Sequence, residues 1–234
     1  GLPPGVRARV EQAIRQEGYD IRCRSIRLNI LEGVVAEDFR LYGSPRDRFP
    51  SLEADEVVLD WNPLDWFQKR DALRGIHVRG GVCRVSTLGY LEDLDSPYVL
   101  RMTDAQADIY MEPAGYQVRR FSADLYGVRV QAAGMIVRDT PWSAGRARML
   151  RPETITRLLE RNANWIPRLG AQLQHMETES SSALNVQFLL HTTNAPLNEI
   201  SLRASGGATR VRGLNFDGWK LHAELAGQEL RINE

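Results

Sequence analysis

The sequence predicts a mainly β protein of the α+β type: a long, curved antiparallel sheet, partly curled, with a short N-terminal helix and one long kinked helix packed on its apolar face. Segments in which apolar and polar residues alternate recur along most of the 234-residue chain. This is the pattern of strands with one buried face and one solvated face. Glycines separate these segments, as expected of tight turns between antiparallel strands.

The first part of the chain predicts a helix and four strands. The helix spans about residues 6–17 and ends at Gly18, as a C-terminal glycine would predict. Glu32-Gly33 forms a tight turn, a bulge near Ser25 is expected because the alternation changes parity there, and Gly80-Gly81 marks a bend. The predicted strands are Ile21–Leu31, Val34–Tyr42, Leu52–Trp61 and Gly75–Val85.

Three half-buried strands and a long helix follow. The strands cover Ala105–Met111, Phe121–Leu125 and Val128–Ala133. The helix is predicted over residues 152–178, with Pro152 as its first residue and a kink at Pro167. The six remaining predicted strands are Leu184–His191, Glu199–Ser205, Ala208–Val211, Leu214–Phe216, Trp219–Leu225 and Gln228–Ile232.

These elements divide the chain into three parts. Residues 1–148 hold the first helix and an antiparallel β unit, 149–182 form a helical connector, and 183–234 form a second β unit. We expect all three to belong to one continuous structural domain, because a helix between two β units needs their apolar faces to cover its own.

Composition excludes some classes of function. Lys and Arg number 30 and Asp and Glu number 30, so the formal net charge is zero and no nucleic-acid partner is expected. No run of about 18 apolar residues is present, so no transmembrane helix is predicted. The chain begins at Gly1 rather than Met, and we expect a signal or an anchor upstream in the full-length protein.

No motif in the chain indicates catalysis, a metal or a cofactor. Cys23 and Cys83 form no Cys-x-x-Cys pair, and no His lies at metal-ligand spacing from either. Each lies in a predicted strand, so a disulfide between them and two buried free thiols are both open interpretations. The four histidines form no catalytic motif, and no phosphate-binding loop or nucleophile elbow is present. We therefore expect a protein that is not an enzyme.

Several stretches resemble AsmA-like proteins. The stretch Gly18–Leu41, with Ile26-Arg27-Leu28-Asn29-Ile30-Leu31-Glu32-Gly33 at its centre, is similar to the opening repeat of that family. Pro50–Trp61 and Leu73–Val85 match its style, and the hairpin of residues 121–135 and the segment Gly213–Leu225 are similar in kind. The resemblance implies an envelope protein of diderm bacteria that is periplasmic and anchored to the inner membrane. Members, including the TamB-like group, form long curved sheets with an apolar groove, and they are linked to outer-membrane biogenesis and lipid transport.

The strands themselves predict an apolar groove, because a sheet with one apolar face must cover that face with helices, another sheet or a ligand. The residues expected to border the groove are Val57, Leu59, Trp61, Ile109, Met111, Phe121 and Leu125. The helix residues expected to plug part of it are Leu158, Leu159, Ile166 and Leu169. The expected function is non-catalytic lipid handling, with a lipid or other apolar ligand and envelope proteins as partners. Two alternatives stay open: an interaction scaffold that pairs through a sheet edge, and a hydrolase with a dispersed site.

Overall fold

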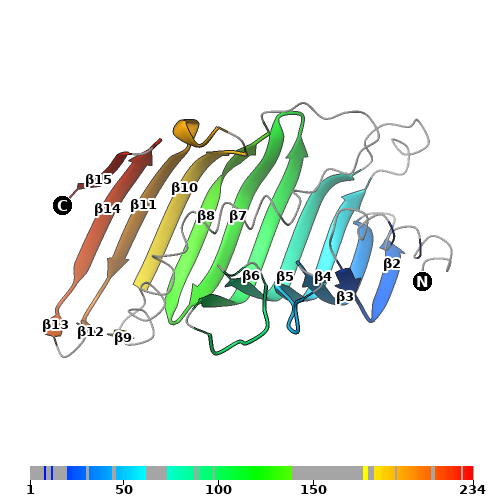
Figure 1. The fold of residues 1–234 in the computed structure, drawn as a ribbon, viewed down its shortest axis with the longest axis horizontal. Coiled ribbons are helices and arrows are strands. Elements are labelled where there is room, and N and C mark those ends of the chain that lie inside the picture. Colours follow the sequence, from blue (N-terminus) through cyan, green and yellow to red (C-terminus); the bar gives the residue numbers. More distant parts are fainter. Residues whose placement is uncertain are drawn as a thin grey trace.

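Strands dominate the computed structural model of the chain (Figure 1). Besides Ala8 and Gln12, the structure describes residues 20–29, 32–43, 46–61, 73–86, 88, 90–96, 98–138, 176–178, 182–192, 194–211, 214–227 and 229–233. They form a 12-stranded sheet and a small three-stranded sheet. The large sheet is open and runs in the order β1-β3-β4-β5-β6-β7-β8-β10-β11-β14-β15, with β2 also paired to β3.

The strands of the first half follow one another as antiparallel neighbours. They are β1 (Asp20–Arg22), β2 (Ser25–Asn29), β3 (Gly33–Tyr42), β4 (Leu52–Trp61), β5 (Leu73–Ser86), β6 (Val99–Glu112), β7 (Gly115–Leu125) and β8 (Val128–Val137). The predicted first strand is interrupted at Cys23 and Arg24, and both of its parts pair with β3. The interruption lets Ile21 and Ile26 both be buried despite their opposite parity.

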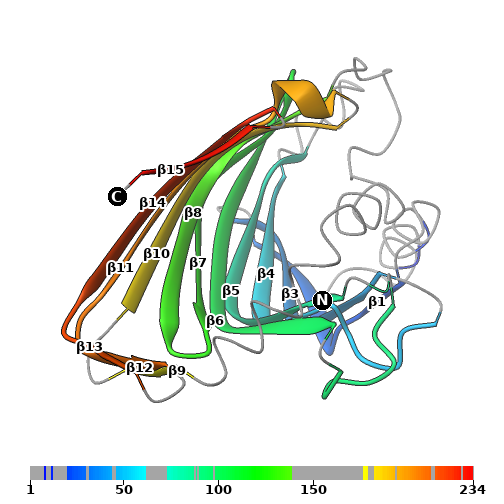
Figure 2. The same ribbon diagram turned by 60° about the vertical axis from the view of Figure 1, so that its left-hand side comes forward.

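The second half completes the large sheet and builds the small one. Its elements are β9 (Met176–Thr178), β10 (Ser182–His191), η1 (Ala195–Leu197), β11 (Glu199–Gly206), β12 (Thr209–Val211), β13 (Leu214–Phe216), β14 (Trp219–Ala226) and β15 (Glu229–Asn233). Strands β9, β12 and β13 form the small sheet, which lies at one end of the longer strands (Figure 2).

The sheet is mixed, whereas the sequence predicted an antiparallel one. β10 pairs in parallel with β8 along its whole length, from Ser182 beside Val128 to His191 beside Val137. A parallel neighbour requires a long crossover connection, and residues 138–181 are long enough to provide it. This pairing joins the strands on the two sides of that connection into one sheet.

The prediction of a long kinked helix packed on the sheet is wrong for the described residues. Met176–Thr178, at the end of the predicted helix, is strand β9 and pairs with β12. Pairing with β12 satisfies its backbone groups, a long-range effect that overrides local helical spacing. From Asp20 onward, the only described helical element is the 3-10 turn η1. The rest of this helix, with Leu158, Leu159, Ile166 and Leu169, lies outside the described residues, as does nearly all of the predicted helix over 6–17.

A crease crosses the first half of the sheet. Asp38 on β3, Gly80 on β5 and Asp104 on β6 have positive φ angles of 48°, 61° and 49°. The pairing register shifts between Val78 and Gly81, so the predicted bend at Gly80-Gly81 is confirmed. The strands turn strongly in this region (Figure 2). The alternation of faces changes parity at the crease, so Val57 on one side of it and Ala54 on the other lie on the same face of β4. Both residues belong to one buried cluster.

Two loops dock on each other beside this crease. The Asp47 carboxylate accepts hydrogen bonds from the backbone N–H of Gly43 at 2.9 Å and of Leu91 at 2.6 Å. The Leu91 carbonyl in turn accepts from the N–H groups of Arg48 and Phe49. The buried Arg84 side chain donates to the Pro50 carbonyl at 3.1 Å, which ties the same loop to β5. These contacts hold the loop between β3 and β4 against the loop between β5 and β6 and against β5 itself.

Candidate functional site

One face of the large sheet carries two adjacent rows of apolar residues, which we call the apolar strip. Directly paired residues share a face, so a row can be followed from strand to strand. The first row runs from β2 to β15 as Ile26, Ala36, Val57, Val78, Ala107, Phe121, Ala132, Val186, Leu202, Ala223 and Ile232. The second runs from β2 to β14 as Leu28, Val34, Leu59, Ile76, Ile109, Val118, Gly134, Phe188, Ile200 and Leu225.

No polar residue interrupts either row. Gly134 is the smallest member, and the Phe188 ring of the neighbouring strand lies where its side chain would be. Eleven strands spaced by about 4.8 Å give the first row a length of about 48 Å. The strip therefore offers one continuous apolar surface along the whole sheet.

The residues that alternate with these rows point to the opposite face. Most of them are polar, but Val35 and Val58, which pair with each other and are 0% and 3% exposed, are apolar and buried on that face. On β2 to β5 the adjoining row is Ser25, Glu37, Glu56 and Arg79, and after the register shift it continues as Gln106, Ser122, Gln131, Asn185, Arg203 and His222. Each strand thus carries the strip on one face and mostly polar residues on the other, with the buried pair Val35 and Val58 as the exception. This is the pattern of a sheet with one predominantly apolar face.

The apolar strip becomes progressively more open toward β15. In the first half, Val57 is 4% exposed and its row neighbours from Ile26 to Ala107 are buried. From β8 onward the members are half-buried, including Val186, Leu202 and Ala223. Ile232 on β15 is 65% exposed, and Leu221, which faces the same side on β14, is 40% exposed. Solvent therefore reaches the half formed by β10, β11, β14 and β15, and it also reaches Leu28 at the β2 end of the second row, which is 49% exposed.

Six of the residues predicted to border a groove lie on the apolar face by strand register: Val57, Leu59, Ile109, Met111, Phe121 and Leu125. Val57 and Phe121 belong to the first row, and Leu59 and Ile109 belong to the second. Met111 and Leu125 flank these rows: Met111 pairs with Tyr116, and Leu125 pairs with Val128. Trp61, the remaining residue, pairs with Leu73. Most of this set is on the more buried half of the strip, so its access to a ligand stays a prediction.

Sequence reasoning missed the members on the open half. Val186, Phe188, Ile200, Leu202 and Leu225 lie in strands that were predicted. Val186, Ile200 and Leu202 have polar neighbours on both sides in the sequence, whereas Phe188 and Leu225 have one on the N-terminal side only. The alternation alone indicated which side chains share a face within one strand. Their assembly with the first half depends on the parallel pairing of β8 with β10, for which the sequence carries no local signal.

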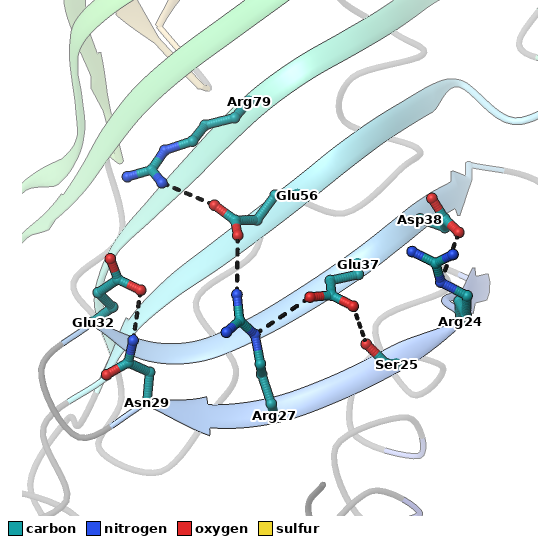
Figure 3. Close-up of polar contacts among 9 residues, drawn as sticks. All are labelled: Arg24, Ser25, Arg27, Asn29, Glu32, Glu37, Asp38, Glu56 and Arg79. Carbon is teal, nitrogen blue, oxygen red and sulfur yellow. Dashed lines mark hydrogen bonds and ion pairs between the residues drawn. The ribbon is translucent and has the colours of Figure 1, made fainter.

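The polar face of β2 to β5 carries a connected set of charges (Figure 3). Arg27 lies between two carboxylates, Glu37 at 3.4 Å and Glu56 at 3.4 Å, and Arg79 contacts Glu56 at 2.9 Å. The Ser25 hydroxyl donates to Glu37 at 2.7 Å. This hydrogen bond is the largest cause that lowers the pKa of Glu37, with Arg27 and Arg24 adding to it. These cations are thus matched by carboxylates.

The arrangement nearest to a catalytic set is also on the polar face. His77 Nδ1 lies 2.9 Å from Asp108 Oδ1, and the other oxygen of Asp108 contacts Arg120 at 3.1 Å. The Tyr110 ring meets the His77 ring edge-on at 5.5 Å. Within the described residues, no hydroxyl or thiol hydrogen-bonds to His77.

Both cysteines are free and half-buried. Cys23 lies between β1 and β2, whose common neighbour is β3, and Cys83 lies on β5 beyond β4. Three strand spacings of about 4.8 Å place them about 14 Å apart, whereas a disulfide needs Cα atoms within about 7 Å. The disulfide interpretation is therefore wrong. Burial raises the pKa of the Cys83 thiol to about 11, against a smaller lowering by Arg84.

Within the described ranges, no group of three or more His, Cys, Asp or Glu side chains is placed to hold a metal ion. A helix with the length and apolar character needed to cross a membrane is likewise not found in that part of the chain. The chain matches no family model, no curated protein and no solved structure.

Proposed function

We propose that the open half of the apolar strip binds the alkyl chains of a lipid or another apolar ligand. The observation that carries this proposal is the uninterrupted first row, which spans eleven strands and ends in half-buried residues and the exposed Ile232. An apolar surface of this extent is unusual on a soluble monomer and typically marks a binding surface. Its continuity suits a long, flexible, apolar molecule better than a compact ligand.

The resemblance to AsmA-like proteins supports the same proposal. A long curved sheet with an apolar groove is what that resemblance implies, and the curved open sheet with one apolar face has this character (Figure 2). On this basis the chain is a non-catalytic module of a periplasmic envelope protein that acts in outer-membrane biogenesis or lipid handling, anchored to the inner membrane in the full-length protein.

A matched pair of substitutions on β11 tests the proposal. Leu202→Glu places a carboxylate within the strip. Ser201→Glu places the same charge at the neighbouring position, whose side chain lies on the opposite face of the sheet. A spin-labelled fatty acid is titrated into each protein, and circular dichroism checks that both variants fold. We expect Leu202→Glu to weaken binding at least about tenfold, because a charge beside an alkyl chain must be desolvated.

Ser201→Glu is expected to bind the fatty acid as the unsubstituted chain does. The lipid proposal is contradicted if the unsubstituted chain binds no fatty acid, or if both variants lose the same affinity. Either result would show that the apolar strip is not a fatty-acid-binding surface.

A second candidate function has one observation in its favour. β15 is the last strand of the sheet in the described structure, and Ile232 on it is 65% exposed. An edge strand with an exposed apolar residue can pair with a strand of another protein. An Ile232→Lys variant would then lose binding to an envelope partner in a pull-down, whereas Leu202→Glu, which lies away from the edge strand, would keep that binding.

A further inference from the structure

We infer that the polar face over β10, β11 and β14 carries a binding site for a phosphate group. Five side chains with hydrogen-bond donors lie on that face at neighbouring positions of the three paired strands, and we call them the basic patch: Asn185, Arg203, Ser205, Lys220 and His222. Strand register aligns Asn185, Arg203 and His222 in one row and pairs Ser205 with Lys220 in the next. This inference goes beyond the proposed function, because the patch lies on the face opposite the apolar strip.

The two permanent cations of the patch have no carboxylate partner. Arg203 and Lys220 are exposed, and neither makes an ion pair within the described structure. On β2 to β5, by contrast, Arg27 and Arg79 share the carboxylate of Glu56 (Figure 3). The nearest acidic contact in the patch is between His222 and Glu224, at 3.2 Å. The patch therefore holds two cations without a carboxylate partner, unlike the paired cations Arg27 and Arg79 on β2 and β5.

The donors suit the oxygens of a phosphate. Arg203 offers a planar guanidinium that can bind two oxygens at once. Lys220 adds a second charge from a diagonal position of the β11–β14 pair, and the backbones of these two residues are about 7 Å apart. The side chains of Asn185 and Ser205 add neutral donors. Because all five project from neighbouring positions of a paired sheet, their backbone positions are fixed before a ligand arrives.

The surroundings restrict the ligand to a small anion. Glu224 lies beside His222 on β14, and Glu229 lies on the adjoining β15. A long polyanion laid across this face would meet these carboxylates, whereas one phosphate group fits within the patch. A phosphate monoester or diester is thus the ligand class, whether it belongs to a lipid headgroup or to a soluble molecule.

Single substitutions in the full chain test the site with inorganic phosphate as probe, measured by calorimetry at low ionic strength. We expect Arg203→Gln and Lys220→Gln each to weaken phosphate binding roughly tenfold, because each removes a charge-assisted contact. Arg231→Gln is the matched control. It removes the same charge from β15, but Arg231 already pairs with Glu229 at 3.1 Å, so phosphate binding should stay unchanged.

A second arm identifies the source of the phosphate. Vesicles of phosphatidylcholine with added phosphatidylglycerol are sedimented with each variant. Binding that falls with Arg203→Gln and Lys220→Gln but not with Arg231→Gln identifies a lipid headgroup, and phosphate binding without vesicle binding identifies a soluble phosphate ester. The inference is overturned if neither probe binds, or if Arg231→Gln loses as much as the patch variants. The strip variant Leu202→Glu should leave phosphate binding intact, which separates this test from that of the apolar strip.

Discussion

Gly80 lies where the sheet creases, and its backbone conformation is one that L-residues rarely adopt. Its φ is +61°, and a Cβ there would collide with the Asp55 carboxylate on β4. Asp38 and Asp104 occupy similar φ values on β3 and β6, which Asp tolerates better than most residues.

We predict that Gly80→Ala lowers the free energy of unfolding by about 2 kcal/mol or more, measured by urea denaturation, because backbone strain and the collision add. Gly127→Ala is the control, since Gly127 also has a positive φ of 85° but nothing lies near a Cβ there. Equal losses for the two variants would show that the crease does not depend on the close approach of Asp55.

The hydrogen bond from Ser25 to Glu37 makes the free energy of unfolding depend on pH. This hydrogen bond lowers the pKa of Glu37 below the ordinary value of 4.5. A carboxyl with a lowered pKa in the folded state stabilises the fold fully above its unfolded pKa, and this contribution is lost as the pH falls through the folded pKa. We predict that Ser25→Ala is less stable than the unsubstituted chain at pH 7 and that the difference shrinks in acid. Urea denaturation across this pH range measures it, and a difference that stays constant with pH would contradict the assignment.

The two thiols should differ in reactivity. Since the pKa of Cys83 is raised to about 11, little thiolate is present near pH 8, and the thiolate is the reactive form. We predict that iodoacetamide labels Cys23 faster than Cys83 in the folded protein, as read by peptide mass spectrometry. Labelling in urea is the control and should be equal at both positions. Equal rates in the folded state would mean that burial does not protect Cys83.

Among the elements, the pair of docked loops depends most on a single side chain. Asp47 accepts backbone hydrogen bonds from both Gly43 and Leu91. Its loss leaves the Leu91 N–H without this acceptor, and leaves the Gly43 N–H with the Ser51 hydroxyl at 3.2 Å. We predict that Asp47→Ala lowers the free energy of unfolding by about 1–3 kcal/mol, measured by thermal or urea denaturation. Asp93→Ala is the control, because the Asp93 carboxylate accepts only from Asp95 within its own exposed loop at 3.0 Å. A cost for Asp93→Ala as large as for Asp47→Ala would contradict the docking role.

Local patterns predicted most strands well, since alternation and turn glycines are properties of the segment itself. β4 has the predicted limits, and β10, β11 and β13 to β15 lie where the alternation placed them. The predicted first strand is interrupted at Cys23 because a sheet edge can accept two short strands where a central position could not. The start of β6 at Val99 was missed because Val99–Met102 pairs with β5 over a stretch whose sequence has no clean alternation.

At the scale of the molecule, the sequence indicated an apolar face but not its full course. The helix predicted over 152–178 has core-type spacing, yet Met176–Thr178 pairs with β12, a partner more than thirty residues away along the chain. The joining of both halves through β8 and β10 is equally non-local. Consequently the predicted site residues cluster on β4, β6 and β7, whereas the open half of the strip is on β10, β11, β14 and β15.

The central claim is that an alkyl chain lies along this open half. Photo-crosslinking with a diazirine-bearing fatty acid, followed by peptide mass spectrometry, tests it at single-residue level. We predict adducts on the apolar strip, at Val186, Leu202 and Ala223, and none at the alternating polar positions Gln187, Ser201 and Glu224. Adducts at the polar positions, or none on either face, would contradict the claim.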